Sequence, residues 1–340
     1  WFSVIIVCME NSPNPPFVEY IPEQIPQKPL ENKFLEAGRE GKNDWWRYLI
    51  GILLTFLIGY GIIGAIPLAG LAVRGYVNGY FSLDELLNSS ENLQNAEYLH
   101  VSKNALFAAI MCIFVAGLFF LWITVRYIHK KRFMSIVASG RQPFSYRRYF
   151  FAFIIYLILS AISLSISYFS NPAAFQLVFE PLPFLGTVII CLLLLPIQTG
   201  WEELFLRGYL LQGLGLWMKK PIFPLLITSL IFGVLHLANK EVTVNGAAEM
   251  LPQYILPGLI FGAIALLDER LELAMGLHLA NNLFGILTIT SPEMTIKANS
   301  IWEVPTIGGS ENIILGMLPL LIVISIFWKM YKWKISKLYR

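Results

Sequence analysis

Three charged residues interrupt an apolar stretch of this sequence. Glu202, Glu203 and Arg207 come directly after a run of mostly apolar residues from Phe184 to Ile197. A charge near the centre of a bilayer costs at least about 2.5–3.5 kcal/mol on insertion scales, so an ionisable residue in such a segment indicates function. Glu203 and Arg207 are four residues apart with the acid first, which favours a salt bridge on one helical face. Glu202 lies about 100° around the helix, so we expect the pair to support the structure and Glu202 to do chemistry.

Two further polar groups lie in apolar stretches. Phe232 and His236 share one helical face, and His278 and Asn282 share another, because each pair is four residues apart. Taken alone, each polar residue is explained by a hydrogen bond between helices. Glu202, two histidines and an asparagine on three separate apolar segments, with few other ionisable groups at depth, predict a convergent site.

The remaining histidines and the cysteines carry no such signal. His100 lies in an acidic stretch and His129 in a basic one, so both are expected on the solvated surface. Cys8, Cys112 and Cys191 share no metal-type spacing, and two of them fall in apolar segments. We expect small apolar packing residues there and no disulfide framework.

These candidate residues need helices to position them, and the composition indicates membrane helices. The chain has 340 residues, of which 56% are hydrophobic and 14% charged, and its mean hydropathy is +0.62. Soluble domains carry about 25% charged residues. We therefore predict an all-α fold, a polytopic transmembrane bundle of about eight helices around a water-filled intramembrane site. The apolar spans lie at about 46–73, 104–125, 149–169, 184–211, 223–238, 252–267, 273–291 and 312–328.

The distribution of Lys and Arg predicts the orientation of the helices. The loop 126–148 carries seven basic residues and the loop 170–183 carries none. On the poorly basic side of the predicted spans lie Arg74, Lys103, Lys240 and Lys297. Both termini are therefore expected in the cytoplasm. The basic loops are explained by topology, so membrane lipid and a peptide or membrane-protein substrate are the expected partners, and nucleic acid is not.

The chain divides into four predicted parts. Residues 1–44 contain six prolines after residue 12 and are expected to form a disordered cytoplasmic tail. Residues 45–170 form three transmembrane helices, and residues 171–292 form a core that holds the three polar motifs. Residues 293–340 form the last transmembrane helix and a basic cytoplasmic tail. A multi-pass protein of the plasma membrane is expected, with the thylakoid and endoplasmic reticulum membranes as alternatives; the oligomeric state is left open.

The three motifs together resemble those of the CPBP family, which comprises type II CAAX prenyl proteases and bacteriocin-processing enzymes and is also called the ABI family. The motifs are Glu202-Glu203-x-x-x-Arg207, Phe232-x-x-x-His236 and His278-x-x-x-Asn282, in this order and each in an apolar span. The resemblance covers about residues 184–290. It implies an intramembrane endopeptidase that hydrolyses a membrane-associated protein or peptide, by CAAX-type or leader-peptide-type processing.

The resemblance also implies roles for the motif residues. Glu202 matches the catalytic glutamate, and a carboxylate in a water-filled cavity inside the membrane suits a general base. His236 would help to position and activate the water. His278 and Asn282 would donate hydrogen bonds to the oxyanion of the tetrahedral intermediate. The charged pair of the first motif would hold its shape.

Alternatives remain at this stage. Glu202, His236 and His278 are also three suitable ligands for a catalytic zinc with water in the fourth position. The sequence has no His-Glu-x-x-His pair and no obvious additional base, so a metal-independent glutamate mechanism is favoured and no cofactor is expected. A non-catalytic membrane scaffold, a bacteriocin self-immunity protein and a transporter are the other functions. A transporter would more often show inverted repeats, and none is visible.

Overall fold

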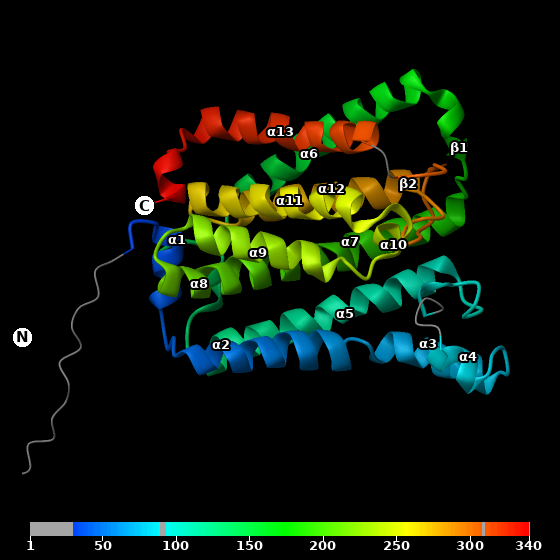
Figure 1. Cartoon of the computed structure of the whole chain (residues 1–340), viewed down its shortest axis with the longest axis horizontal. Coiled ribbons are helices and arrows are strands. Elements are labelled where there is room, and N and C mark those ends of the chain that lie inside the picture. The colour runs from blue at the N-terminus through cyan, green and yellow to red at the C-terminus, as the bar shows by residue number, and fades with distance from the viewer. Residues whose placement is uncertain (1–29, 89–92, 308–309, 340) are drawn as a thin grey trace, which may run out of the picture.

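A computed structural model describes residues 30–88, 93–307 and 310–339. In this part of the chain, long helices run roughly parallel to one another (Figure 1). The first long helix continues into a π-helical segment, and another π-helical segment directly follows the Glu202-Glu203 motif. The long helices and their continuations are α2 Trp45–Ile52 with η2 Leu53–Ile63, α3 Ile66–Val77, α5 Lys103–Ile123 with η4 Thr124–Ile128, α6 Tyr146–Ser170, α7 Pro181–Glu203 with η7 Leu204–Leu210, α8 Leu211–Met218, α9 Ile222–Leu235, α11 Ala247–Asp268, α12 Glu272–Thr288 and α13 Ser310–Tyr331.

Short elements lie at the two ends of the bundle. The short helices are α1 Lys33–Glu36, η1 Ala37–Arg39, α4 Leu83–Asn88, η5 Phe133–Ile136, η6 Pro172–Ala174, α10 Lys240–Asn245 and η8 Ile335–Leu338. Three two-residue strands form one sheet in the order β1-β3-β2: β1 Gln176–Leu177, β3 Trp302–Glu303 and β2 Ile289–Thr290. Gln176 pairs with Glu303 in an antiparallel register, and Ile289 pairs with Trp302 in a parallel one. The sheet and α10 lie at one end of the bundle, whereas α1 and the end of the chain lie at the other (Figure 1).

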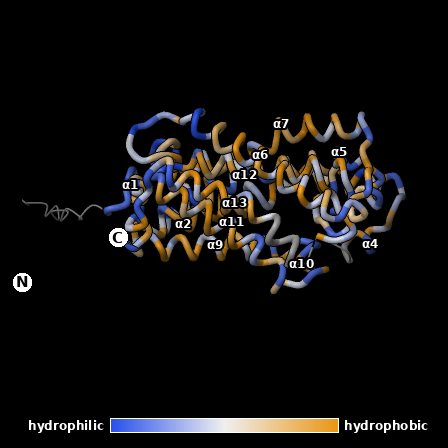
Figure 2. The backbone as a smooth tube through the Cα atoms, turned by 90° about the horizontal axis from the view of Figure 1, so that it is seen from above, coloured by the Kyte–Doolittle hydropathy of each residue, from blue (hydrophilic) through white to orange (hydrophobic). Residues whose placement is uncertain are grey.

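The outer faces of the helices are apolar, whereas the outer faces of helices in a soluble protein are polar. On α6, Ile154, Ile158, Ile162 and Ile166 recur every four residues and are each about half exposed. Apolar residues lie along the length of the helices, and hydrophilic residues gather towards the helix ends (Figure 2). An unpartnered apolar stripe of this kind is stable in lipid, so the chain is an integral membrane protein with a helical fold.

The number of crossings stays a prediction. Within the described residues, five helical stretches are long and apolar enough to span a membrane, and each coincides with a predicted span. Two further apolar helices, in the regions of α9 and α13, are shorter, and α12 has 17 residues. The five long stretches are Trp45–Val77, Lys103–Ile128, Tyr146–Ser170, Pro181–Met218 and Ala247–Asp268.

Aromatic packing fixes the helix that carries the first motif. The ring of Trp201 on α7 stacks on Tyr60 at 4.9 Å and on Phe205 at 5.3 Å between centroids. Gly117 on α5 makes room for it, because a Cβ there would lie 2.6 Å from Trp201 Nε1. Rings stacked in this way bury a large apolar area and restrict rotation of the helix, which sets the direction of the neighbouring carboxylates.

Residues 30–44, which precede the first membrane helix, pack against the bundle. Phe34 and Leu35 are fully buried, and the Asn32 amide donates to Leu266 O and Lys337 O, both at 3.1 Å. The expectation of a disordered tail over residues 1–44 is therefore wrong for residues 30–44. Residues 1–29 lie outside the described part. The expectation failed because this stretch is rich in prolines and charges and has only one short apolar pair, Phe34 and Leu35, which packs against the end of the bundle (Figure 1).

The expectation for His129 is also wrong. Its side chain is fully buried, with Nδ1 2.8 Å from Lys42 O and Nε2 2.9 Å from the Tyr209 hydroxyl. The residue lies directly after η4 and is covered by the N-terminal segment. Burial lowers the pKa of His129 to about 4, so the neutral ring is the form that the fold accommodates. His100 is exposed, as expected.

Candidate active site

The two carboxylates of the first motif are placed at the junction of α7 and η7. Glu203 and Arg207 form the predicted salt bridge, with 3.0 Å between Oε1 and Nη1, and both side chains are fully buried. Arg207 also donates from Nη2 to Gly258 O at 3.2 Å and lies 4.7 Å from the centre of the Phe232 ring. Glu202, offset by about 100° on the helix, lies beside His278 and not in this salt bridge. The buried pair thus joins α7 to α9 and α11.

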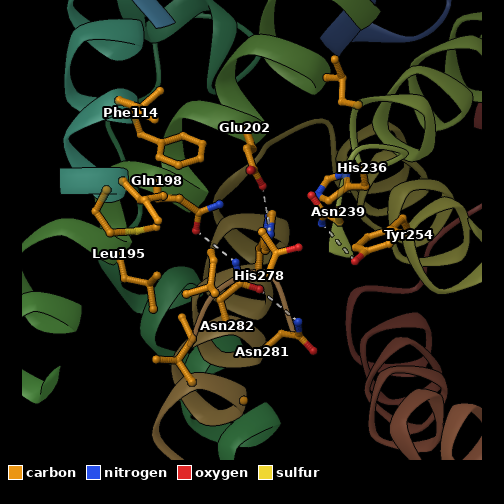
Figure 3. A pocket seen from close by; sticks show the side chains of 18 of the residues that line it. Phe114, Leu195, Gln198, Glu202, His236, Asn239, Tyr254, His278, Asn281 and Asn282 are labelled. Atoms are coloured by element: carbon orange, nitrogen blue, oxygen red, sulfur yellow. Dashed lines mark hydrogen bonds and ion pairs between the residues drawn. The ribbon is translucent and has the colours of Figure 1, made fainter. Parts of the chain in front are cut away.

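His278 on α12 lies between both carboxylates. Its Nδ1 is 2.8 Å from Glu203 Oε1, and its Nε2 is 3.3 Å from Glu202 Oε2 (Figure 3). Glu203 is paired with Arg207 and accepts, so Nδ1 carries the proton of this bond. The Nε2 atom of His278 is the nitrogen that faces Glu202. The Phe261 ring stacks on the histidine at 5.1 Å and restricts its orientation.

Asn282 stands one helical turn beyond His278. Its Nδ2 donates to Gln198 Oε1 at 3.0 Å, and its Oδ1 accepts from Asn281 Nδ2 at 3.1 Å. Asn281 is in turn held by the Tyr156 hydroxyl at 2.9 Å. Because an amide nitrogen has two N–H groups, Asn282 keeps one donor beyond the bond to Gln198. The asparagine is thus oriented and still able to bind an oxygen.

His236 follows the last residue of α9 and is oriented by backbone and ring contacts. Its Nδ1 is 2.7 Å from Phe232 O, and its ring stacks on Tyr254 at 4.2 Å. A carbonyl oxygen accepts only, so Nδ1 is the protonated nitrogen and Nε2 is able to accept a hydrogen bond from a water. The four-residue spacing of Phe232-x-x-x-His236 brings the histidine to the backbone carbonyl of Phe232 and places the two rings 4.7 Å apart between centroids.

Tyr254 is itself held by a buried acid. Its hydroxyl donates to Glu241 Oε1 at 2.5 Å, and the other Glu241 oxygen accepts from Thr295 N at 2.8 Å and Thr295 Oγ1 at 2.7 Å. Burial works to raise the pKa of Glu241, but the hydrogen bonds from Tyr254 and Thr295 outweigh it and hold the pKa below its ordinary value. Glu241 is thus ionised, and its hydrogen bonds connect α10, α11 and the segment after α12.

All four predicted catalytic residues line one cavity of about 550 Å³. Aromatic and amide side chains line the cavity together with Glu202, His236, His278 and Asn282 (Figure 3). The aromatic side chains of the lining are Phe56, Tyr60, Phe114, Trp201, Phe232, Tyr254 and Phe261. The predicted convergence of the three motifs is present in the structure, while Glu203 and Arg207 lie behind the cavity wall.

The structure adds lining residues that the sequence interpretation did not name. Gln198 precedes Glu202 by four residues, so its place on the same helical face was readable from the spacing. Tyr254, Glu241 and Asn281 had no comparable signal, because each has a hydrogen-bond partner thirteen or more residues away. Among the described residues, no group of three or more His, Cys, Asp and Glu side chains is arranged to hold a metal ion. The alternative ligand set for zinc, which added His236 to Glu202 and His278, is not formed.

These features define a polytopic helical membrane protein with a carboxylate–histidine–amide site inside the bundle. Residues 181–284 match the family described as type II CAAX prenyl endopeptidase Rce1-like. The chain is also 32% identical over 278 residues to the uncharacterized protein YyaK of Bacillus subtilis (strain 168), a match that covers 78% of this chain and 88% of that protein. No solved structure matches the chain. The chain belongs to the Rce1-like family, so the resemblance drawn from the three motifs is confirmed.

Proposed function

We propose that this protein is an intramembrane endopeptidase in which Glu202 activates a water molecule for attack on a peptide bond. The observation that carries the proposal is the contact between Glu202 Oε2 and His278 Nε2, at 3.3 Å, in the wall of a cavity enclosed by membrane helices. A base needs a defined proton partner and access to water. Glu202 has both, since it is close to an oriented imidazole and lines the cavity.

The reaction is a hydrolysis. The water oxygen bonds to the carbonyl carbon while one of its protons passes to the Glu202–His278 pair, and the carbonyl becomes an oxyanion. The C–N bond then breaks, and the same pair returns the proton to the leaving amine nitrogen. His236 orients the water through Nε2, and the remaining N–H of Asn282 stabilises the oxyanion. Arg207 neutralises Glu203, which leaves that carboxylate free to orient His278 from the rear.

Membership of the Rce1-like family and the aromatic lining of the cavity support a substrate that is bound from within the membrane. The processed polypeptide is either a CAAX-type carboxyl-terminal segment or a leader-type segment, and rings such as Tyr60, Phe114 and Trp201 would contact its apolar part. The amide side chains of the lining would bind its backbone.

The proposal is tested by comparing new protein N-termini in membranes of cells that carry the wild-type protein or the Glu202→Gln variant. Loss of a defined set of N-termini in the variant, at equal protein level, is the expected result and also names the substrate. If the variant produces the same set and supports the same cellular phenotype, the protein acts by binding and the proposal fails.

A further inference from the structure

We propose that Lys103, Lys240 and Lys297 form a site that binds the phosphate group of an anionic membrane lipid. Lys103 is the first residue of α5, Lys240 is the first residue of α10, and Lys297 lies between β2 and β3. These three residues form the lysine cluster, and the elements that carry them meet at the end of the bundle that holds the small sheet (Figure 1). None of the three lines the catalytic cavity, so the site is separate from the proposed function and does not depend on it.

Hydrogen bonds bring the three lysine backbones together. The backbone N–H of Lys240 donates to Thr295 Oγ1 at 2.6 Å, two residues before Lys297. The Asn299 amide, two residues after Lys297, donates to Asn104 Oδ1 at 2.9 Å, and Asn104 is the second residue of α5. The segment around Lys297 is therefore held between the beginnings of α10 and α5, where the other two lysines lie.

The side chains of the lysine cluster lie at the surface. All three lysines are exposed. Next to Lys297 in the segment, Ala298 and Ser300 are buried, and Ser300 Oγ donates to Ile286 O on α12 at 2.7 Å. Because small side chains occupy the inner positions of the segment, the ammonium group of Lys297 stays outside, where a ligand can reach it.

The positive charges of the lysine cluster act on one another. Partial burial is the main cause that lowers the pKa of Lys297 below its ordinary value, and the charges of Lys240 and Lys103 are the next two causes. Glu303 raises the pKa of Lys297, but its effect is smaller than that of either lysine. Like charges at close range repel one another, so an anion that binds between them stabilises the cluster.

The nearby acids do not supply this anion. Among the described residues, no carboxylate forms a salt bridge with a lysine of the cluster. Glu241 is occupied by Tyr254 and Thr295, and Glu293 accepts from the Asn245 amide. Three of the four basic residues on the poorly basic side of the predicted spans thus gather where no described acid pairs with them.

The position of the lysine cluster favours a lipid as the source of the anion. Two of the five long apolar stretches, those of α5 and α7, begin at this end of the bundle (Figure 1). The Asn104 amide donates to Pro183 O at 2.8 Å, which places the cluster next to the first turn of α7. The outer face of α7 continues with the exposed side chains of Leu182, Leu185 and Ile189. Lipid phosphates lie at the level of such helix ends, and basic pockets between membrane helices bind anionic head groups.

The test is a titration of the purified full-length protein in detergent with phosphatidylglycerol, in which native mass spectrometry gives the dissociation constant of the tightest-bound lipid. The triple variant Lys103→Gln, Lys240→Gln, Lys297→Gln is expected to raise this constant roughly 100-fold, since one lysine near an anionic lipid surface changes the affinity roughly fivefold. Phosphatidylcholine, which has no net charge, is expected to bind both proteins equally weakly. An unchanged constant for phosphatidylglycerol in the triple variant would overturn the proposal.

A second triple variant separates the site from the net charge of the protein. Lys329→Gln, Lys332→Gln and Lys334→Gln remove the same charge from exposed positions at the other end of the bundle, and this variant should bind phosphatidylglycerol as the wild type does. An equal loss in both triple variants means that binding follows net charge, which contradicts a defined site. Inorganic phosphate distinguishes a lipid from a free anion. If it binds through the lysine cluster and phosphatidylglycerol does not, the lipid is ruled out as the ligand.

Discussion

His278 holds its Nε2 atom 3.3 Å from Glu202 Oε2 while its Nδ1 is fixed by a second carboxylate, that of Glu203, at 2.8 Å. Two adjacent acids thus have different tasks although they are neighbours in sequence. Glu203 is neutralised by Arg207 and orients the ring from behind, and Glu202 faces the cavity. The imidazole is thus fixed between the two acids, with Nδ1 directed at Glu203 and Nε2 at Glu202.

Replacement of Glu202 by Gln should abolish peptide hydrolysis and leave the yield of folded protein near that of the wild type. The amide keeps the size of the side chain and can still bond His278, but it cannot accept the proton of the attacking water. Size-exclusion chromatography in detergent measures the yield, and a membrane cleavage assay measures activity. An active Glu202→Gln variant would remove the glutamate from the mechanism.

Replacement of Arg207 by Ala should reduce the yield as well as the activity. It leaves Glu203 buried without its cation, and breaking a buried pair costs about 3–5 kcal/mol. The double variant Glu203→Gln with Arg207→Met removes both charges and should recover much of the yield, because no buried charge is left unpaired. Equal yields for the single and double variants would show that the pair has no structural role.

Replacement of Asn282 by Ala should lower turnover by roughly 10²–10³ with little change in substrate binding, as expected for loss of one oxyanion donor. The Gln198→Ala variant is the matched control. It removes the partner that orients Asn282, a bond worth about 1 kcal/mol, and should lower turnover roughly fivefold. The separate measurement of kcat and KM decides, since a loss confined to KM would assign Asn282 to substrate binding.

Replacement of Tyr254 should affect activity through His236. The Tyr254→Ala variant removes the stacked ring, an interaction worth about 0.5–1.5 kcal/mol, whereas Tyr254→Phe keeps the ring and loses the bond to Glu241. Activity is expected to fall in the order wild type, Tyr254→Phe, Tyr254→Ala. Equal kcat for all three proteins would show that Tyr254 does not position His236.

Protonation of His129 should limit stability in acid. The folded protein keeps the ring neutral down to a pKa of about 4, whereas an unfolded chain takes up the proton near the ordinary value of 6.5. The unfolded state therefore binds more protons between these values, and the thermal midpoint in detergent should fall as the pH drops from about 6.5 to 4. The His129→Phe variant should lose this component, and the exposed His100→Gln variant should keep it. An unchanged pH dependence in His129→Phe would contradict the assignment.

Much of the site was predictable because it is local in sequence. The Glu203–Arg207 pair and the two histidine motifs are separations of four residues on helices, and helical geometry fixes those faces. The double contact of His278 was not predictable, since it depends on how α12 approaches α7 across 75 residues of sequence. His129 was misplaced for a related reason. A basic loop is usually solvated, and nothing local indicates that the segment around Lys42 packs over His129.

The bonds that Asn32 makes to Leu266 and Lys337 have a mechanical consequence. They connect the beginning of the described chain, the end of α11 and the chain after α13 at one point. The helix α11 has 22 residues and is about 33 Å long at 1.5 Å per residue. A tilt of about 5° about the connected end moves the far end of the helix, at Ala247, by about 3 Å, and it moves Tyr254, about 21 Å from the connected end, by about 2 Å. Such a tilt would act on the hydrogen bond between Tyr254 and Glu241 while the connected end stays in place.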